Sequence, residues 1–242
     1  MIPIGDTIPG RFPALALWLL IALNAAVFMV ELGAPPEALK RTFYWWGVVP
    51  ALYTQQGAAA YLAHPWPFAA GIFLHVGWAH LLMNLWTFWI FGDNVEDVMG
   101  PVRFTLFFLF CGVMAAGAHV WAHPGSTVPA VGASGAIAGV MGAYFVMYPR
   151  ASVVMLFPLV FIPVFFRIPA VIYIGLWGAG QALSGLAALG APADAGGVAF
   201  WAHLGGFAAG MVGYRFFVAR TGPRARLFRD EISLGGVWRR RK

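Results

Sequence analysis

The feature that most constrains this chain is a series of long apolar runs, each about 20 residues long, the length that a helix needs to cross a bilayer. The runs that meet this requirement cover residues 14–32, 73–92, 102–122, 131–148, 168–188 and 198–219. Only 10% of the 242 residues are charged, whereas a soluble domain carries about 25%. The sequence therefore predicts an all-α, polytopic membrane protein with six transmembrane helices, and it excludes a disordered chain, a coiled coil and an ordinary soluble enzyme.

Charge predicts how these spans are oriented. Six spans place both chain ends on one side, and nine of the fifteen Lys and Arg residues lie at or after Arg215, which makes that side cytoplasmic. We expect an N-terminal cytoplasmic segment over residues 1–13, a membrane domain over 14–219 and a basic cytoplasmic tail over 220–242. The arginine bias and the compact size favour a bacterial inner (plasma) membrane and leave an organelle open.

Two further segments do not fit a simple span. The apolar run 152–166 is short and contains Pro158 and Pro163, which favours an interfacial or re-entrant position. The first outer loop, residues 33–72, is long and rich in aromatic residues. It is interpreted either as an aromatic belt at the interface or as a cover for a site.

The basic tail also bears on partners. The net charge is +6, but the basic residues of the tail do not alternate with stacking aromatics, so we expect no nucleic acid. Contact of the tail with anionic lipid headgroups is expected instead. The single cysteine, Cys111, excludes an intramolecular disulfide.

Strongly polar side chains inside the predicted spans are functional candidates, because their burial in lipid is costly. They are His80 and Asn84 in the second span, Ser134 at the head of the fourth and His203 near the head of the sixth, with Asn24 and Gln181 as lesser cases. The second, fourth and sixth spans all run inward from the outer face. Their first turns therefore share one depth in the outer half of the membrane, and His80 and Asn84 share one helix face.

This set of residues permits nucleophilic catalysis. A serine hydroxyl needs a base, most often histidine, and amide or imidazole donors can stabilise the oxyanion that forms. No carboxylate is expected at this depth, so a Ser134–His203 dyad fits better than a triad. The alternatives stay open: Ser134 among small residues is also typical of a close helix contact, and a membrane histidine often only bonds a neighbour.

The remaining histidines suggest no metal site. The sequence has no H-E-x-x-H pattern, and the spacing of His75 and His80 places them on different helix faces, with His75 expected in the loop. His64, His119 and His123 are expected in or near loops, solvated or interfacial. We therefore predict neither a metal nor a cofactor.

Several segments, taken together, resemble the motifs of the rhomboid family of intramembrane serine proteases. They are residues 75–84, 91–100 and 132–139, the pair Trp177 and Gln181, and residues 202–210. The resemblance extends over residues 42–214. It implies a six-helix bundle with a water-filled cavity open to the outer face, and it implies transmembrane protein substrates with small, helix-destabilising residues near the outer membrane boundary.

The resemblance also implies roles for individual residues. Ser134 is the implied nucleophile and His203 the general base, while His80, Asn84 and the Ser134 backbone N–H are the implied oxyanion hole. No metal or cofactor is implied. Some members carry an aromatic residue, which stacks on the base, where this chain has Ala138, so the sequence does not identify what orients His203. Some also carry Trp-Arg in the first loop, where Trp66 is followed here by Pro67.

Two other functions compete with proteolysis. A non-catalytic rhomboid-like protein would bind or route membrane clients, and its usual mark is the loss of the serine or the histidine, both of which are present here. A small transporter or channel predicts inverted repeats or paired broken helices, and the sequence has neither.

Overall fold

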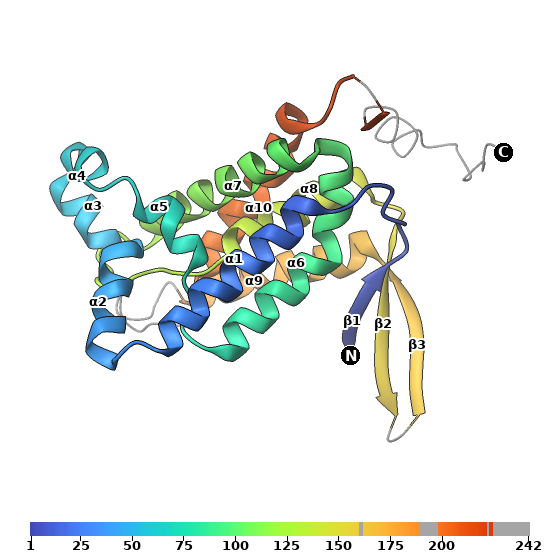
Figure 1. Cartoon of the computed structure of the whole chain (residues 1–242), viewed down its shortest axis with the longest axis horizontal. Coiled ribbons are helices and arrows are strands. Elements are labelled where there is room, and N and C mark those ends of the chain that lie inside the picture. The colour runs from blue at the N-terminus through green and yellow to red at the C-terminus, as the bar shows by residue number, and fades with distance from the viewer. Residues whose placement is uncertain (160–161, 189–197, 222, 225–242) are drawn as a thin grey trace.

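The computed structural model describes residues 1–159, 162–188, 198–221 and 223–224. Six helices within this part of the chain pack as a bundle (Figure 1), and each overlaps one of the six predicted apolar runs. They are α1 (Leu15–Leu32), α6 (Trp78–Met99), α7 (Pro101–Ala122), α8 (Ser134–Met147), α9 (Ala170–Ala188) and α10 (Phe200–Phe217).

Some of these helices meet the length and hydropathy that a membrane span requires. Among the described residues, α1, α7 and α9 each do so alone. A fourth span results if α6 is joined to the preceding segment Pro67–Phe73, from which it is bent by 96°. The shorter helix α8 is also apolar. The chain is therefore mostly helical with three or four candidate spans, and the six-span topology stays a prediction.

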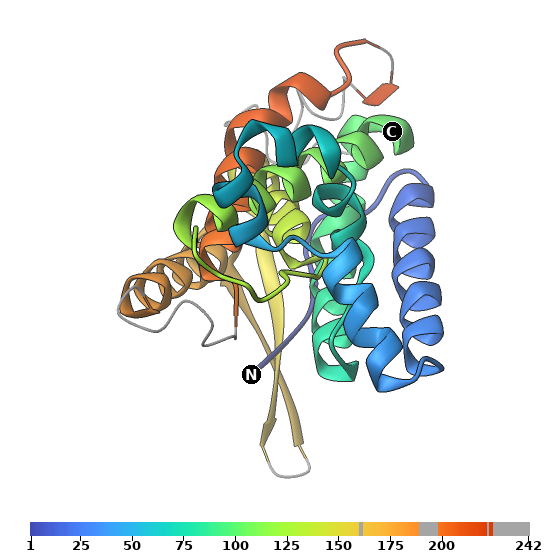
Figure 2. The same ribbon diagram turned by 90° about the vertical axis from the view of Figure 1, so that its left-hand side faces the viewer.

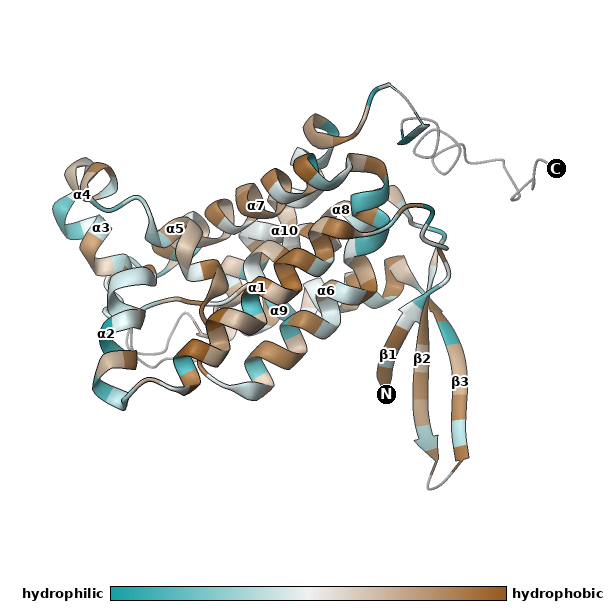
Figure 3. Cartoon of the chain, in the orientation of Figure 1, coloured by the Kyte–Doolittle hydropathy of each residue, from teal (hydrophilic) through white to brown (hydrophobic). Residues whose placement is uncertain are grey.

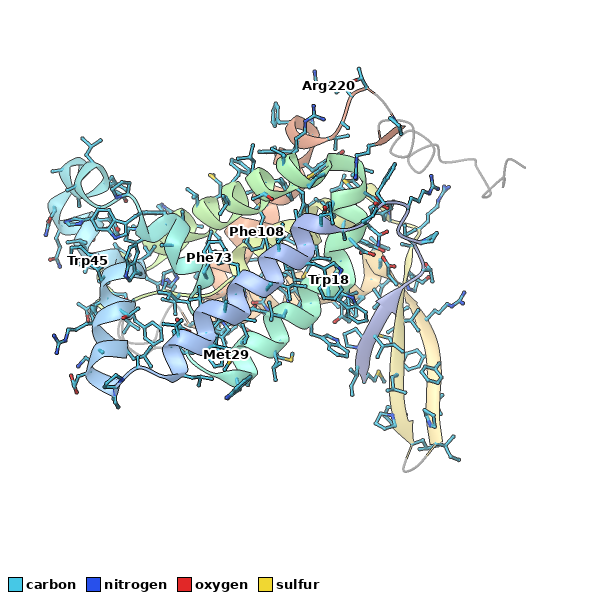
Figure 4. All side chains as sticks on the ribbon, in the orientation of Figure 1. Trp18, Met29, Trp45, Phe73, Phe108 and Arg220 are labelled. Carbon is cyan, nitrogen blue, oxygen red and sulfur yellow. The ribbon has the colours of Figure 1, made fainter. Side chains whose placement is uncertain are left out.

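The exposure of side chains also fits helices that are packed in a bundle and surrounded by lipid. Trp18 and Met29 on α1 are exposed apolar side chains, whereas Phe108 on α7 is fully buried (Figure 4). In the hydropathy colouring, α1 and α7 consist largely of apolar residues (Figure 3). An exposed apolar surface of this extent is expected where lipid is the solvent.

The segment between α1 and α6, predicted as a long loop, consists mainly of short helices. These are α2 (Pro36–Trp46), α3 (Pro50–Gln56), α4 (Ala58–Ala63), α5 (Pro67–Ala70) and the 3₁₀ helix η1 (Gly71–Phe73). Aromatic contacts hold it together: the rings of Trp45 and Trp66 lie 5.4 Å apart, and the Trp66 indole N–H donates to the Trp45 carbonyl oxygen at 3.1 Å. Most of the segment lies at one end of the bundle (Figure 1).

A three-stranded antiparallel sheet lies at the opposite end of the bundle, so the prediction of an all-α protein is wrong here. Its order is β1 (Ile2–Asp6), β2 (Ser152–Leu159) and β3 (Ile162–Pro169). Valine, isoleucine and phenylalanine, abundant in this run, favour strands. Pro158 pairs with Pro163 beyond the part of β2 that β1 covers, where both strands are edges and proline is tolerated.

The β2–β3 hairpin projects sideways from the bundle in both views (Figures 1 and 2). Both of its faces carry exposed apolar side chains, those of Phe157, Leu159, Ile162, Val164 and Phe165. An exposed hairpin in water would alternate apolar and polar residues. This composition is the one expected of a segment lying in the membrane interface, and that position stays a prediction.

Polar contacts tie the sheet to the bundle. Asp6 at the end of β1 accepts hydrogen bonds from the Tyr144 hydroxyl of α8 and, at 2.7 Å, from the Asn94 amide of α6. Burial raises the pKa of Asp6 to about 6. The Trp86 indole N–H also donates to the Pro3 carbonyl oxygen at 2.6 Å. The N-terminal residues are therefore an integral part of the fold.

Two carboxylates of α6 accept hydrogen bonds from backbone N–H groups in the first turn of α1 and in the segment just before it. Glu96 accepts hydrogen bonds from Ala16 and Leu17 at 3.0 and 2.8 Å, and Asp97 accepts one from Arg11 at 2.7 Å. A helix N-terminus leaves such donors unpaired otherwise. The guanidinium of Arg224, beyond α10, donates to the carbonyl oxygens of the same two residues, so the N-terminal segment and the chain after α10 meet at one end of the bundle.

The closest helix packing joins α8 to α10. A Cβ atom added at Gly210 would overlap the carbonyl oxygen of Gly139, and one added at Gly206 would overlap that of Gly135. Small residues let two helix backbones approach in this way, which is a main source of helix association in membranes. This contact sets the separation between the first turns of α8 and α10.

We expect Gly210→Ala to lower the thermal unfolding temperature of the protein in detergent, because overpacking of this kind costs about 1–3 kcal/mol. Gly180→Ala is the matched control: it lies on α9, where an added Cβ meets nothing within 4 Å. An unfolding temperature of Gly210→Ala equal to that of the control would contradict the packing.

A second prediction concerns the hairpin. A spin label attached at Phe165→Cys in lipid vesicles should be more accessible to oxygen than to a water-soluble nickel complex, because the residue faces the membrane interface. Gln56→Cys, an exposed position in α3, should show the opposite preference. The native Cys111 is fully buried and stays unlabelled. A water-exposed label at position 165 would show that the hairpin stands clear of the membrane.

Candidate active site

The first residue of α8 and the first turn of α10 meet through their side chains. The Ser134 hydroxyl oxygen and the His203 Nε2 atom lie 2.8 Å apart. The two residues are 69 positions apart in the sequence, and the shared direction of α8 and α10 places both at the same end of the bundle. A contact between these two side chains is what a common depth of the two helix starts predicts.

The other ring nitrogen of His203 faces α9. Its Nδ1 atom lies 2.6 Å from the Gln181 Oε1 atom. A carbonyl oxygen only accepts, so Nδ1 carries the proton and donates, which leaves Nε2 free to accept from Ser134. The Trp177 ring, one turn before Gln181, lies 6.0 Å from the imidazole at an interplanar angle of 34°. Gln181 and Trp177 thus supply the orientation that the sequence left unidentified.

The loop before Ser134 depends on Gly132. Its φ is +122°, a conformation that favours glycine, and an added Cβ would stand 2.6 Å from the His80 ring. The Gly132 N–H donates to the Gly71 carbonyl oxygen at 2.8 Å. Two backbone hydrogen bonds between Val48 and Ala130 anchor the same loop. His80 therefore lies directly beside the backbone that leads into Ser134.

Asn84 provides a donor close to this loop. Its side chain is 6% exposed, and within the described part of the chain its Nδ2 atom is buried without a hydrogen-bond partner. The Nδ1 atom of His80 is unpaired in the same way. A buried unpaired donor costs free energy, and a group that binds an oxyanion has this arrangement before its ligand arrives.

These side chains line one cavity of about 940 Å³. Its walls come from α6, α7, α8, α9 and α10, and all four predicted site residues, His80, Asn84, Ser134 and His203, belong to them. A volume near the upper end of the usual range for ligand pockets, about 300–1,000 Å³, is large enough for a stretch of extended peptide. The cavity therefore combines a paired serine and histidine with free donors.

The remaining polar candidates lie in other places. Asn24 is buried in α1 and donates to the Leu20 carbonyl oxygen at 2.7 Å, outside the cavity. His75 lies between η1 and α6, in a loop as predicted, with its ring 5.0 Å from that of His80. His64 packs against the rings of Trp45 and Trp66.

Two histidines lie near a loop, as predicted, but their part in the cavity wall was not predicted. His119 lies in the last turn of α7, His123 is the residue that follows the helix, and both line the cavity. Their four-residue spacing, and that of Trp177 and Gln181, could have indicated a shared helix face. Among the described residues, no group of three or more His, Cys, Asp and Glu side chains is arranged to hold a metal ion.

Comparisons with known proteins place the chain in a family. A family profile described as Rhomboid domain matches residues 62–220, more than half of the chain. This chain belongs to the rhomboid family. With its apolar helices, the membership makes it a multi-pass membrane protein of the rhomboid protease family.

Individual relatives share parts of this rhomboid chain. It is 40% identical to rhomboid protease GluP of Bacillus subtilis over 78 residues, which are 32% of the chain and 15% of the relative. It is 27% identical to the mitochondrial rhomboid protein 1 of Saccharomyces cerevisiae over 170 residues, 69% of the chain and 45% of the relative. The chloroplastic rhomboid-like protein 11 of Arabidopsis thaliana is 39% identical over 85 residues, 33% of the chain and 29% of the relative. The chain thus matches less than half the length of each.

Gln181→Leu should slow the reaction of Ser134 with a fluorophosphonate probe by about tenfold, because a hydrogen bond contributes about 0.5–1.5 kcal/mol and 1.4 kcal/mol is tenfold in rate. Gln181→Glu, which keeps an acceptor oxygen, should retain most of the rate. Leu183→Ala, an exposed position on the same helix, is the control. Equal labelling rates in Gln181→Leu and wild type would show that Gln181 does not orient the base.

Proposed function

We propose that this rhomboid-family chain is an intramembrane serine endopeptidase that cleaves transmembrane proteins near the outer membrane boundary. The observation that carries the proposal is the 2.8 Å contact between the Ser134 hydroxyl and the His203 Nε2 atom. The cavity around this pair supports it, because a peptide has room to reach the serine there.

The proposed reaction proceeds in two steps. Ser134 attacks the substrate carbonyl carbon while His203 accepts the hydroxyl proton at Nε2, and His203 then returns this proton to the leaving amine. Asn84, His80 and the Ser134 backbone N–H donate to the oxyanion of each tetrahedral intermediate. Water then attacks the acyl-enzyme, with His203 again taking the proton, and releases the second product. No metal or cofactor takes part.

The proposed setting is a bundle of six transmembrane helices with both chain ends in the cytoplasm of a bacterium. The site then lies in the outer half of the inner membrane, and a substrate helix must unwind there, at small residues, to expose a carbonyl group. The basic tail would contact anionic headgroups. Most of the tail, residues 225–242, lies outside the described residues.

Labelling by a fluorophosphonate probe tests the nucleophile and the base. We expect the purified wild-type protein to be labelled and both Ser134→Ala and His203→Ala to remain unlabelled, because the serine needs its base. Cleavage of a transmembrane substrate in lipid vesicles should follow the same pattern. A folded wild-type protein that takes no label would favour the alternative, a non-catalytic rhomboid-like protein that binds or routes membrane clients.

The same labelling and cleavage experiments test whether Asn84 belongs to the proposed oxyanion hole. Asn84→Ala should lower substrate turnover by about 10²-fold, the usual effect of losing one oxyanion donor. Asn24→Ala is a matched control, since it removes another buried membrane asparagine that lies outside the cavity. Equal turnover in the two variants would remove Asn84 from the mechanism.

A further inference from the structure

A pair of histidines in the cavity wall takes no part in the proposed reaction. The rings of His119 and His123 lie 4.7 Å apart at an interplanar angle of 35°. The His123 N–H donates to the His119 carbonyl oxygen at 3.0 Å, so the helical spacing continues through both residues. Both line the cavity that contains Ser134 and His203.

Each ring of the pair has an unsatisfied nitrogen. Within the described residues, the Nδ1 atoms of His119 and His123 are both buried and have no hydrogen-bond partner. Buried polar atoms in native proteins are nearly always paired, and an exception points to a water molecule or an ion. One ligand in contact with both Nδ1 atoms would satisfy both rings.

The chemistry of the pair selects the kind of ligand. His119 in the last turn of α7 and His123, the residue that follows the helix, have the four-residue spacing with which the two histidines of an H-E-x-x-H motif hold Zn²⁺. Imidazole suits zinc, copper and nickel, whereas Mg²⁺ and Ca²⁺ prefer oxygen ligands. The nearby Ser126 is buried and lines the same cavity, but it offers only a neutral hydroxyl.

We propose that a divalent transition-metal ion such as Zn²⁺ binds to His119 and His123 in the cavity wall and inhibits the reaction of Ser134. The inhibitory part rests on the proposed function. No third His, Cys, Asp or Glu side chain among the described residues completes the site, so water fills the remaining coordination positions. A site of this kind binds reversibly, as a regulatory ion does, and has open positions unlike a structural zinc site.

Inhibition follows from charge. His203 must take up a proton and become an imidazolium as Ser134 attacks, and a doubly charged ion in the same cavity opposes that change. Both ring nitrogens of His203 already have partners in Ser134 and Gln181. The ion therefore acts on the base through its field and its volume, and does not bind to it.

Calorimetric titration of the purified full-length chain, carrying an affinity tag without histidines, tests the binding. We expect one Zn²⁺ or Ni²⁺ ion per chain, and at least tenfold weaker binding in His119→Gln and in His123→Gln. His64→Gln removes a histidine outside the cavity and should bind as wild type does. MgCl₂ should give no binding. Absent binding in wild type, or binding as tight as that of wild type in both His119→Gln and His123→Gln, would overturn the site.

Comparing His119→Gln with His123→Gln separates a loss of metal binding from a loss of folding. His123 caps α7, so its replacement disturbs the helix less than a replacement of His119. The thermal unfolding temperature of each variant without metal shows whether it is folded. A rise in that temperature on adding ZnCl₂ should occur in wild type and His64→Gln only, because a ligand that binds the folded state stabilises it. A zinc-dependent rise in the unfolding temperature of both His119→Gln and His123→Gln would also overturn the site.

Fluorophosphonate labelling with and without ZnCl₂ then tests the inhibition. Saturating zinc should slow labelling of the wild type at least tenfold, and a chelator should restore the rate. In His119→Gln and His123→Gln, the ratio of the labelling rates with and without zinc should stay near one. Zinc that binds without slowing labelling would overturn the inhibitory part. Absent labelling of metal-free wild type would count against the protease itself, while the calorimetric result still decides whether the metal site exists.

Discussion

The site depends on the backbone contact between α8 and α10. In lipid, two helices gain little from burying apolar side chains against each other, so close approach of their backbones must supply the association. Glycines at 135 and 139 face glycines at 206 and 210 with no room for a Cβ atom. Because Ser134 precedes this contact on one helix and His203 on the other, the 2.8 Å separation of their side chains is a consequence of helix packing.

Buried polar groups are satisfied to different degrees in different parts of the molecule. At the end that carries the sheet, carboxylates and backbone donors satisfy one another, as Glu96 does with the start of α1. Four of the eight side-chain atoms that are buried without a partner within the described part of the chain lie in the cavity wall: they are nitrogens of Asn84, His80, His119 and His123. The other four are spread over the rest of the bundle, and one of them, the Asn94 Oδ1 atom, lies near the sheet. Unsatisfied groups cost stability, so their concentration around Ser134 indicates a place prepared for ligands. The proposed oxyanion hole and the proposed metal site are two consequences of this one feature.

The candidate site could be predicted further than the fold around it. His80, Asn84, Ser134 and His203 were predicted as candidates because polar groups in apolar spans are rare and because the predicted direction of three spans gives them one depth; all four line one cavity in the structure. The role of Gln181 was not identified, since one amide in a span has many local partners and only the packing of α9 against α10 brings it to His203. The hairpin of β2 and β3 was also missed as sheet, because a continuous apolar run has no alternation that distinguishes a strand from a helix.

By itself, the sequence determined that the chain is an apolar, mostly helical membrane protein and where its apolar helices lie, and it predicted which polar residues share a depth. These properties follow from composition, run length and charge, which act locally along the chain. Only the tertiary structure decided which nitrogen of His203 faces Ser134, why position 132 must be glycine, that residues 2–6 complete a sheet with residues 152–159 and 162–169, and that His119 and His123 line the same cavity. Each of these properties depends on contacts between segments that are far apart in the sequence, and local sequence patterns do not determine how close such segments lie in space.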